Sequence, residues 1–138
     1  MLDLCFSNIL YSKDASLLKL IDPKGAIVED EIYTDPYYDL AKLSHSICGY
    51  YDYFNSDLFQ ITVDEGLKSH LSMDFDNSEY VAVFRKKLEE NGMDLKLIRL
   101  YECSLFLSML PLHIDRPKKV YAFILNAIAI LNSLEDAK

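Results

Sequence analysis

From residue 36 onward, most of the chain is organised by apolar residues that recur every three or four positions. This spacing lines one face of a helix with apolar side chains, so each such stretch predicts an amphipathic helix. The pattern covers residues 36–54, 79–90, 94–109 and 117–134. Pro36 and Pro117 stand where helices begin, and Gly92 and Pro111 stand where they end. We therefore expect a mostly helical body.

A short β-hairpin is expected ahead of this body. Apolar runs at residues 9–11 and 17–21 flank the turn-like segment 12–16, and Pro23 with Gly25 ends the second run.

A second hairpin is expected between the first two helices. Residues 58–63 have the composition of a strand, residues 64–66 suit a turn, and residues 67–75 are expected to form the partner strand. The fold class predicted is α+β, mainly α, in which small β-hairpins accompany a helical body.

Composition limits the chain to a few classes of protein. Its 138 residues fit a single domain, 1–138, and 51% hydrophobic with 26% charged residues is globular composition. No apolar run reaches the roughly 18 residues that cross a membrane. The first residues lack a basic segment followed by a cleavage site, so we expect a cytoplasmic protein that does not contact a membrane.

Charge and cysteine content narrow the choice further. A formal net charge of −8 argues against nucleic acid as a partner, and an acidic chain that handles phosphate would need a divalent cation or a local group of donors. Cys5, Cys48 and Cys103 are far apart and form no C-x-x-C pair. They predict small buried apolar side chains, not disulfides or a zinc site.

The first hairpin is also the part of the sequence that suggests chemistry. If Leu10 pairs with Leu20, then Asn8 lies opposite Asp22. Opposed residues have Cβ atoms about 4.5–5.5 Å apart, close enough for an amide oxygen and a carboxylate to share one cation. Mg²⁺ needs only one or two protein carboxylates. A slip of one residue would place the two side chains on opposite faces.

Asp3 lies on the loop that leads into this hairpin, where it could take a proton from an attacking hydroxyl. Residues 3, 8 and 22 resemble the catalytic core of the protein-kinase-like phosphotransferases in type and spacing. The strings D-L-C-F-S-N-I-L, L-I-D-P-K-G and D-P-Y-Y-D-L-A-K-L are similar to the aminoglycoside and choline kinase-like branch. Within it, they resemble the phosphotransferases associated with bacterial surface-polysaccharide synthesis.

This resemblance implies a role for each residue. Asp3 would be the catalytic base, Asn8 and Asp22 would bind the metal, and Asp39 would support the catalytic loop from the following helix. The chain would be the C-terminal lobe of a kinase-like enzyme that uses Mg²⁺ and ATP to phosphorylate a hydroxyl of a sugar or small alcohol.

The chain also departs from the family pattern. Met1-Leu2-Asp3 replaces the usual H-G-D, and the sequence has no glycine-rich loop, strand-borne Lys, partner Glu or hinge. A nucleotide lobe would have to come from another chain, another copy or sequence beyond this chain. We therefore expect negligible kinase turnover from residues 1–138 alone.

Each candidate residue also has a structural explanation. Asp22 before Pro23 can begin a turn, Asn8 can bond to its own backbone, and Asp39 can favour the helix dipole. The histidines show no metal-ligand spacing, so packed or solvent-facing roles are favoured for His45, His70 and His113. Several tyrosines could line a sugar-binding surface, but packing at the edge of the core is favoured for residues 33, 37, 38, 50, 51 and 53.

A second function from another class fits the same residues. The chain could be a non-catalytic kinase-like remnant that serves as a binding or oligomerisation module. A lobe without its partner leaves apolar surface uncovered, and such surface usually lies in an interface. A homo-oligomer, most simply a two-fold dimer, is expected in that case.

Overall fold

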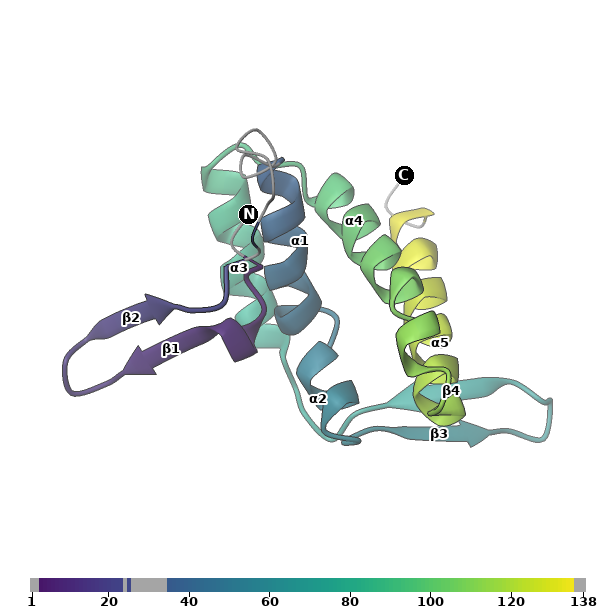
Figure 1. Cartoon of the computed structure of the whole chain (residues 1–138). Coiled ribbons are helices and arrows are strands. Elements are labelled where there is room, and N and C mark those ends of the chain that lie inside the picture. Colours follow the sequence, from purple (N-terminus) through teal and green to yellow (C-terminus); the bar gives the residue numbers. More distant parts are fainter. Residues whose placement is uncertain (1–2, 24, 26–34, 136–138) are drawn as a thin grey trace.

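The computed structural model describes residues 3–23, 25 and 35–135. Helices and short antiparallel strands make up the described part of the chain, as Figure 1 shows. In chain order they are η1 (Phe6–Asn8), β1 (Ile9–Ser12), β2 (Leu17–Leu20), α1 (Pro36–Ile47), α2 (Tyr51–Asn55), β3 (Gln60–Val63), β4 (Ser69–Ser72), α3 (Ser78–Glu90), α4 (Leu95–Ser108), η3 (Pro111–His113) and α5 (Pro117–Glu135). The fold is α+β and mainly α.

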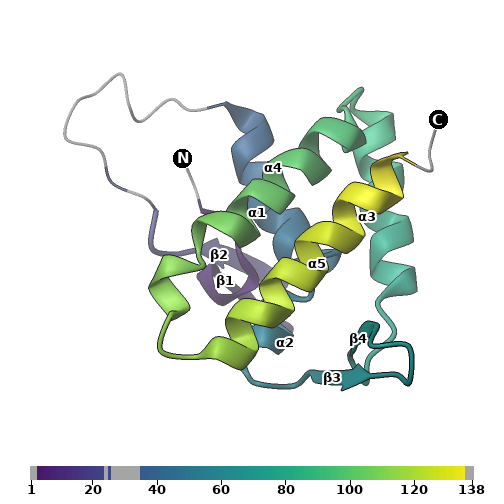
Figure 2. The ribbon, with the colours of Figure 1, turned by 90° about the vertical axis from the view of Figure 1, so that its right-hand side faces the viewer.

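Helix α4 is the centre of the helical body. It packs against α1 on one side and against α5 on the other, and α3 lies against both α1 and α4 (Figures 1 and 2). The two hairpins extend to opposite sides of this body in Figure 1. The β1–β2 hairpin leaves from the α1 side, whereas β4 lies against α5.

Two apolar clusters form the core, one on each side of α4. The aromatic side chains of Phe54, Phe106 and Phe123 dominate the cluster shared by α2, α4 and α5. Ala41 and Ile98 belong to the second cluster, which α1, α3 and α4 share. Because α4 contributes to both clusters, it joins the two halves of the helical body.

Local sequence signals explain where the helices begin. Asp35 caps α1 by accepting a hydrogen bond of 2.9 Å from the backbone N–H of Tyr37, and Pro36 occupies the first helical position. Asp94 caps α4 by accepting from the N–H groups of Lys96 and Leu97. The helices predicted at 79–90, 94–109 and 117–134 are confirmed, with ends that differ by one residue at most.

The single helix predicted over residues 36–54 is wrong. The structure has two helices, α1 and α2, with a break between Ile47 and Tyr51. At the break, Tyr50 has a left-handed backbone with φ of 57°. Gly49 lies so close to α4 that an added Cβ would be 2.9 Å from the ring of Phe106. Tertiary packing against α4 therefore ends a helix that the apolar periodicity would have continued.

The second hairpin is confirmed in place, with shorter strands than predicted. Ile61 pairs with Leu71, and both side chains pack against the aromatic cluster. No helix in the described part of the chain is long and apolar enough to cross a membrane. The three cysteines are free, with Cys5 and Cys103 buried and Cys48 half-buried.

The first hairpin is confirmed, but its predicted register is wrong by one residue. Leu10 pairs with Lys19, not with Leu20, and the backbone N–H of Ile21 donates to the carbonyl of Asn8 at 2.9 Å. The four-residue loop 13–16 ends with Ser16 in a left-handed conformation, φ 47°. Loop length and turn geometry set the register of a hairpin, and this loop brings Ser12 opposite Leu17.

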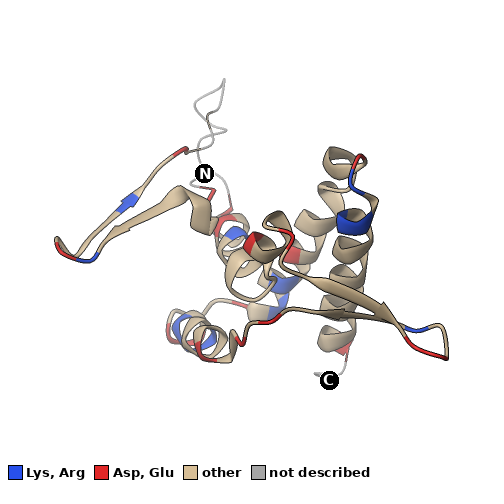
Figure 3. Ribbon diagram, turned by 90° about the horizontal axis from the view of Figure 1, so that it is seen from below, with Lys and Arg blue, Asp and Glu red and all other residues tan. Residues whose placement is uncertain are grey.

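The observed register collects apolar side chains on one face of the β1–β2 hairpin. Opposed residues share a face, so Ile9 and Leu20 lie beside Tyr11 and Leu18. Tyr11 is 67% exposed and Leu18 is 58% exposed. Figure 3 shows that the charged residues of this hairpin are few and lie mainly at its tip and ends. We call these four side chains the apolar face of the first hairpin.

Candidate functional site

The loop that leads into the first hairpin is bound to helix α1 through its first described residue. The backbone N–H of Asp3 donates to Oδ1 of Asp39 at 3.2 Å. Asp3 has a left-handed backbone with φ of 47°, a conformation that Asp tolerates better than most residues. Asp39 therefore makes the contact that a residue supporting this loop from the helix would make.

Helix α1 contacts the loop along one face. Asp39, Lys42 and Ser46 are three and then four positions apart, the spacing of neighbours on a helix surface. Oγ of Ser46 accepts a hydrogen bond of 3.1 Å from the backbone N–H of Phe6. The ammonium of Lys42 lies 3.0 Å from Oδ1 of Asp3. Three side chains on one face of α1 thus fix the position of loop 3–8.

Lys42 is a site residue that the sequence analysis missed. Burial alone would lower the pKa of Lys42, but the hydrogen bond and the negative charge of Asp3 raise it, and the net effect is a raised pKa. The ammonium of Lys42 therefore stays charged next to Asp3 at neutral pH. Its position three residues after Asp39 on a predicted helix was the signal that could have identified it.

Asn8 closes the loop by a hydrogen bond to its first described residue. Its Nδ2 donates to the backbone carbonyl of Asp3 at 3.0 Å. Because the nitrogen of the amide is used in this bond, the oxygen Oδ1 is the atom that remains to bind a cation. Asn8 does bond to a backbone group, as its structural explanation allowed, but that group is the carbonyl of Asp3.

Asp22 lies just past the hairpin ladder. It follows Ile21, whose backbone is bonded to Asn8, and it is exposed with φ of 52°. Within the described residues it makes no hydrogen bond to Asn8 or Asp3. The structure therefore joins Asp3, Asn8 and Asp39 by hydrogen bonds and leaves Asp22 adjacent in the chain to the residue that pairs with Asn8. The direct opposition of Asn8 and Asp22 predicted from the sequence is wrong. Ile21 lies opposite Asn8, so a regular continuation of the strand would place Asp22 on the other face of the hairpin, and only the left-handed backbone of Asp22 interrupts that alternation.

A site made only of carboxylates, thiols and imidazoles is absent from the described part of the chain. No three His, Cys, Asp or Glu residues there are grouped so that they could hold a metal ion. Asn8 and Asp22 supply one amide and one carboxylate, so a cation there would take its other ligands from water or phosphate.

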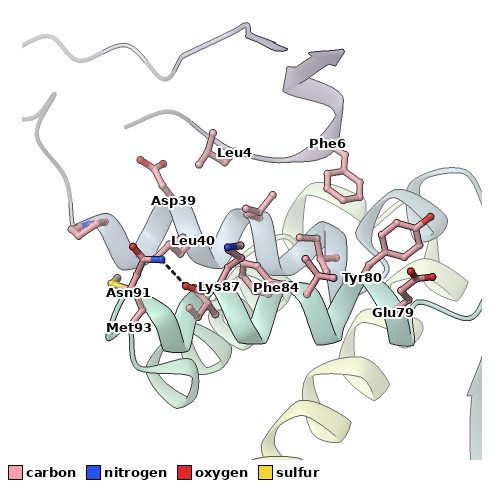
Figure 4. A pocket seen from close by; sticks show the side chains of 15 residues that line it. Leu4, Phe6, Asp39, Leu40, Glu79, Tyr80, Phe84, Lys87, Asn91 and Met93 are labelled. Carbon is pink, nitrogen blue, oxygen red and sulfur yellow. Dashed lines mark hydrogen bonds between the residues drawn. The ribbon is translucent and has the colours of Figure 1, made fainter. Parts of the chain in front are cut away.

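An apolar groove of about 850 Å³ lies below the loop, between α1 and α3 (Figure 4). Leu4 and Phe6 of the loop lie on one side of the groove, and Leu40 and Phe84 line its floor. Polar groups occur at its rim, where Asn91 donates to the backbone carbonyl of Lys87 at 2.7 Å. The groove is thus a largely apolar surface that adjoins the loop of Asp3.

A buried polar cluster lies between α1 and α4. Glu102 is fully buried, accepts from Ser44 and lies 2.5 Å from the guanidinium of Arg99. Burial raises the pKa of Glu102 more than Arg99 and Ser44 lower it. His45 is also buried, and its ring stacks on Tyr51 at 4.3 Å. The packed role expected for His45 is confirmed.

The other two histidines and most tyrosines also have structural roles. His70 is exposed and lies 2.9 Å from Asp64, and His113 packs edge-on against Phe123. Tyr33 lies outside the described residues. Packing at the edge of the core is confirmed for Tyr37, Tyr38, Tyr50 and Tyr51. Tyr53 is not part of either apolar cluster.

Comparisons of the chain with family models, curated proteins and solved structures find no significant match. The resemblance to kinase-like phosphotransferases therefore stays a prediction from the sequence, at residues 3, 8, 22 and 39.

Proposed function

We propose that the chain is the C-terminal catalytic half of a Mg²⁺-dependent, ATP-type phosphotransferase that acts on a hydroxyl of a sugar or small alcohol. The observation that carries the proposal is the hydrogen-bonded set of Asp3, Asn8 and Asp39. Spacing pointed to Asp3 and Asn8, the family resemblance added Asp39, and hydrogen bonds join the three in the fold. A lobe that binds the nucleotide would come from another chain, another copy or sequence beyond this chain.

Asp3 is the proposed base. Its carboxylate would accept the proton of the acceptor hydroxyl as the hydroxyl oxygen bonds to the γ-phosphorus and the bond to the ADP oxygen breaks. Lys42 holds this carboxylate through the ion pair of 3.0 Å, and Asp39 holds the backbone of the same residue. Positioning of this kind is a large part of what a phosphotransferase contributes.

Asn8 and Asp22 are the proposed metal ligands. The two are not opposed in the hairpin, so the side chain of Asp22 would have to turn toward Asn8 beyond the end of the ladder, where its left-handed backbone interrupts the alternation of the strand. Both offer oxygen atoms, which are the ligands that Mg²⁺ prefers, and the bond from Nδ2 of Asn8 leaves its oxygen for this purpose. A bound Mg²⁺ would neutralise charge on the phosphates of the nucleotide.

Paramagnetic NMR would test the metal site residue by residue. Mn²⁺ replaces Mg²⁺ at oxygen sites and broadens nearby amide signals. In the full chain we expect the signals of Asn8, Asp22 and their neighbours to broaden first, and Asp22→Asn to remove the effect. Asp14→Asn, which removes the same charge from the hairpin tip, should leave it intact. Broadening that begins elsewhere, or that survives Asp22→Asn, would exclude this metal site.

A binding or oligomerisation module is the second candidate function. It is favoured by the exposed apolar face of the first hairpin, where Tyr11 and Leu18 have no cover from the described part of the chain. A two-stranded hairpin is at best marginally stable on its own, so a covering partner would stabilise it. A second copy of the chain is the simplest partner.

A further inference from the structure

Helix α5 is largely apolar on the side that faces solvent as well as on the side that faces the core. Between Lys119 and Glu135 the sequence has no charged residue, and Figure 3 shows charged residues on α5 only near its ends. A surface helix normally carries charged side chains on its outer face, whereas a helix that is apolar all round is buried. The composition of α5 is therefore that of a helix covered on both sides.

The described part of the chain covers only one side of α5. Phe123, Ala127 and Ile130 are buried and belong to the aromatic cluster of the core. On the opposite side, Tyr121 is 43% exposed and Ile128 is 48% exposed. Figure 2 shows α5 on the side of the molecule that faces the viewer. An apolar helix face thus remains open to solvent.

The side chains on this open face follow a regular spacing. They are exposed or half-buried and alternately three and four positions apart, at residues 118, 121, 125, 128, 132 and 135. We call these six residues the outer stripe of α5. Their spacing is the heptad pattern of helices that pair lengthwise. A second helix could lie along the outer stripe for about 27 Å.

Opposite charges stand at the two ends of the outer stripe. Lys118 begins it and Glu135 ends it, and neither forms an ion pair within the described residues. The ammonium of Lys118 lies 4.9 Å from the centre of the Phe59 ring, and its N–H groups can still meet a carboxylate. Two such stripes in antiparallel orientation would pair Lys118 with Glu135 at both ends, whereas parallel stripes would bring like charges together. The outer stripe is therefore complementary to an antiparallel copy of itself.

We infer that α5 pairs in antiparallel orientation with α5 of a second copy of the chain, along the outer stripe. Residues equally distant from the middle of the stripe then meet across the interface: Leu125 with Ile128, Tyr121 with Asn132, and Lys118 with Glu135. Each contact occurs twice, as in the two-fold interfaces of most homodimers. The amide of Asn132 lies beside the hydroxyl of Tyr121, which also bonds to Ser69 of its own copy.

This interface is separate from the first hairpin. The β1–β2 hairpin leaves the helical body from the α1 side, whereas α5 packs on the other side of α4 (Figure 1). The inference goes beyond the proposed function, because the pairing requires neither Asp3 nor a metal. If both surfaces associate, the chain forms assemblies larger than a dimer. Leu18→Lys on the hairpin would then leave the α5 dimer intact.

Sedimentation equilibrium of the full chain carrying Leu18→Lys tests this inference, because that substitution removes association through the first hairpin. We expect a reversible dimer with twice the monomer mass of 15.9 kDa. Adding Ile128→Lys places a charge near the middle of the outer stripe and should leave a monomer. Leu112→Lys is the matched control, since Leu112 is 75% exposed but lies outside the stripe, and this variant should remain a dimer.

Charge reversal in the same Leu18→Lys chain tests the antiparallel orientation. Lys118→Glu should weaken the dimer by about tenfold, because it turns two attractive pairs into repulsive ones. Adding Glu135→Lys should restore the affinity, although the two residues are about 25 Å apart along one helix and cannot contact each other there. The inference is wrong if the Leu18→Lys chain is a monomer, if Ile128→Lys dissociates the dimer no more than Leu112→Lys does, or if the second reversal restores nothing.

Discussion

The backbone N–H of Asp3 meets the carboxylate of Asp39 at 3.2 Å, although 36 residues separate them. This bond links the loop that carries the proposed base to the first turn of α1. The ion pair between Lys42 and Asp3 and the bond from Phe6 to Ser46 extend the same attachment along one helix face. The loop is thereby held in one arrangement before any ligand binds.

Two substitutions of Asp39 should distinguish support of the loop from a favourable interaction with the dipole of helix α1. Asp39→Ala removes the acceptor for the loop and should lower the free energy of unfolding by about 1–2 kcal/mol. Asp39→Asn keeps an acceptor oxygen but removes the charge that interacts with the helix dipole. Chemical denaturation should show the Asn variant close to the wild type. An equal loss of unfolding free energy in Asp39→Ala and Asp39→Asn would mean that the charge acts on the helix dipole, and would argue against support of the loop.

Self-association should depend on one face of the first hairpin. Leu17 and Leu18 are both 58% exposed, but only Leu18 belongs to the apolar face. If a second copy covers that face, Leu18→Lys should lower the mass measured by light scattering toward that of the monomer, 15.9 kDa. Leu17→Lys should leave the mass unchanged. A wild-type chain that is monomeric at all concentrations would contradict the oligomerisation module.

The break between α1 and α2 should not tolerate a side chain at residue 49. A Cβ added to Gly49 would lie 2.8 Å from the backbone oxygen of His45 and would also meet Glu102 and Phe106. We expect Gly49→Ala to destabilise the fold by about 1–3 kcal/mol in a thermal or denaturant melt. Gly25→Ala is the control, because a Cβ there would meet nothing within 4 Å. Equal stability of Gly49→Ala and Gly25→Ala would contradict this prediction.

Buried His45 should make stability depend on pH. Burial, with the positive charges of Lys42 and Arg99, lowers the pKa of His45 to about 3. Between about pH 6.5 and pH 3 the unfolded chain binds a proton at this residue and the folded chain does not. The free energy of unfolding should therefore fall as pH falls through this window, by about 1.4 kcal/mol per pH unit from His45 alone.

His45→Phe isolates this contribution, since all other titrating groups, including Glu102, remain in the variant. Denaturant melts from pH 7 to pH 4 should show a weaker pH dependence for the variant than for the wild type. Parallel plots of unfolding free energy against pH would mean that the pKa of His45 is not lowered in the folded chain.

Local signals made most of the helices predictable. Helical periodicity defined α4 within a residue, and Pro117 marked the start of α5. The end of α1 was not predictable in the same way, because it depends on the approach of Gly49 to α4. That contact exists only once residues 49 and 102 are brought together by the fold.

The candidate site was predictable as a set of residues but not in its geometry. Spacing selected Asp3, Asn8 and Asp22, and the family resemblance added Asp39. Hydrogen bonds join Asp3 to Asn8 and to Asp39, but not to Asp22. The hairpin register depends on the left-handed conformation of Ser16, which residue type does not reveal, so the opposition of Asn8 and Asp22 was wrong. Lys42 was missed because its partner Asp3 is distant in the sequence.

Kinase turnover by the isolated chain should be negligible, since no nucleotide lobe accompanies it. A phosphorylation assay with Mg²⁺, ATP and a panel of sugars and small alcohols checks this. Rates in the usual kinase range of about 1–100 s⁻¹ would show that residues 1–138 are sufficient for catalysis.

Calorimetric titration of the full chain with Mg²⁺-ATP tests the central claim most directly. If Asn8 and Asp22 form a metal and phosphate site, the wild type should bind Mg²⁺-ATP weakly and Asp22→Ala should not bind it. Asp14→Ala, the charge control at the hairpin tip, should bind as the wild type does. Absence of binding by the wild type at millimolar ligand, or undiminished binding by Asp22→Ala, would contradict the account.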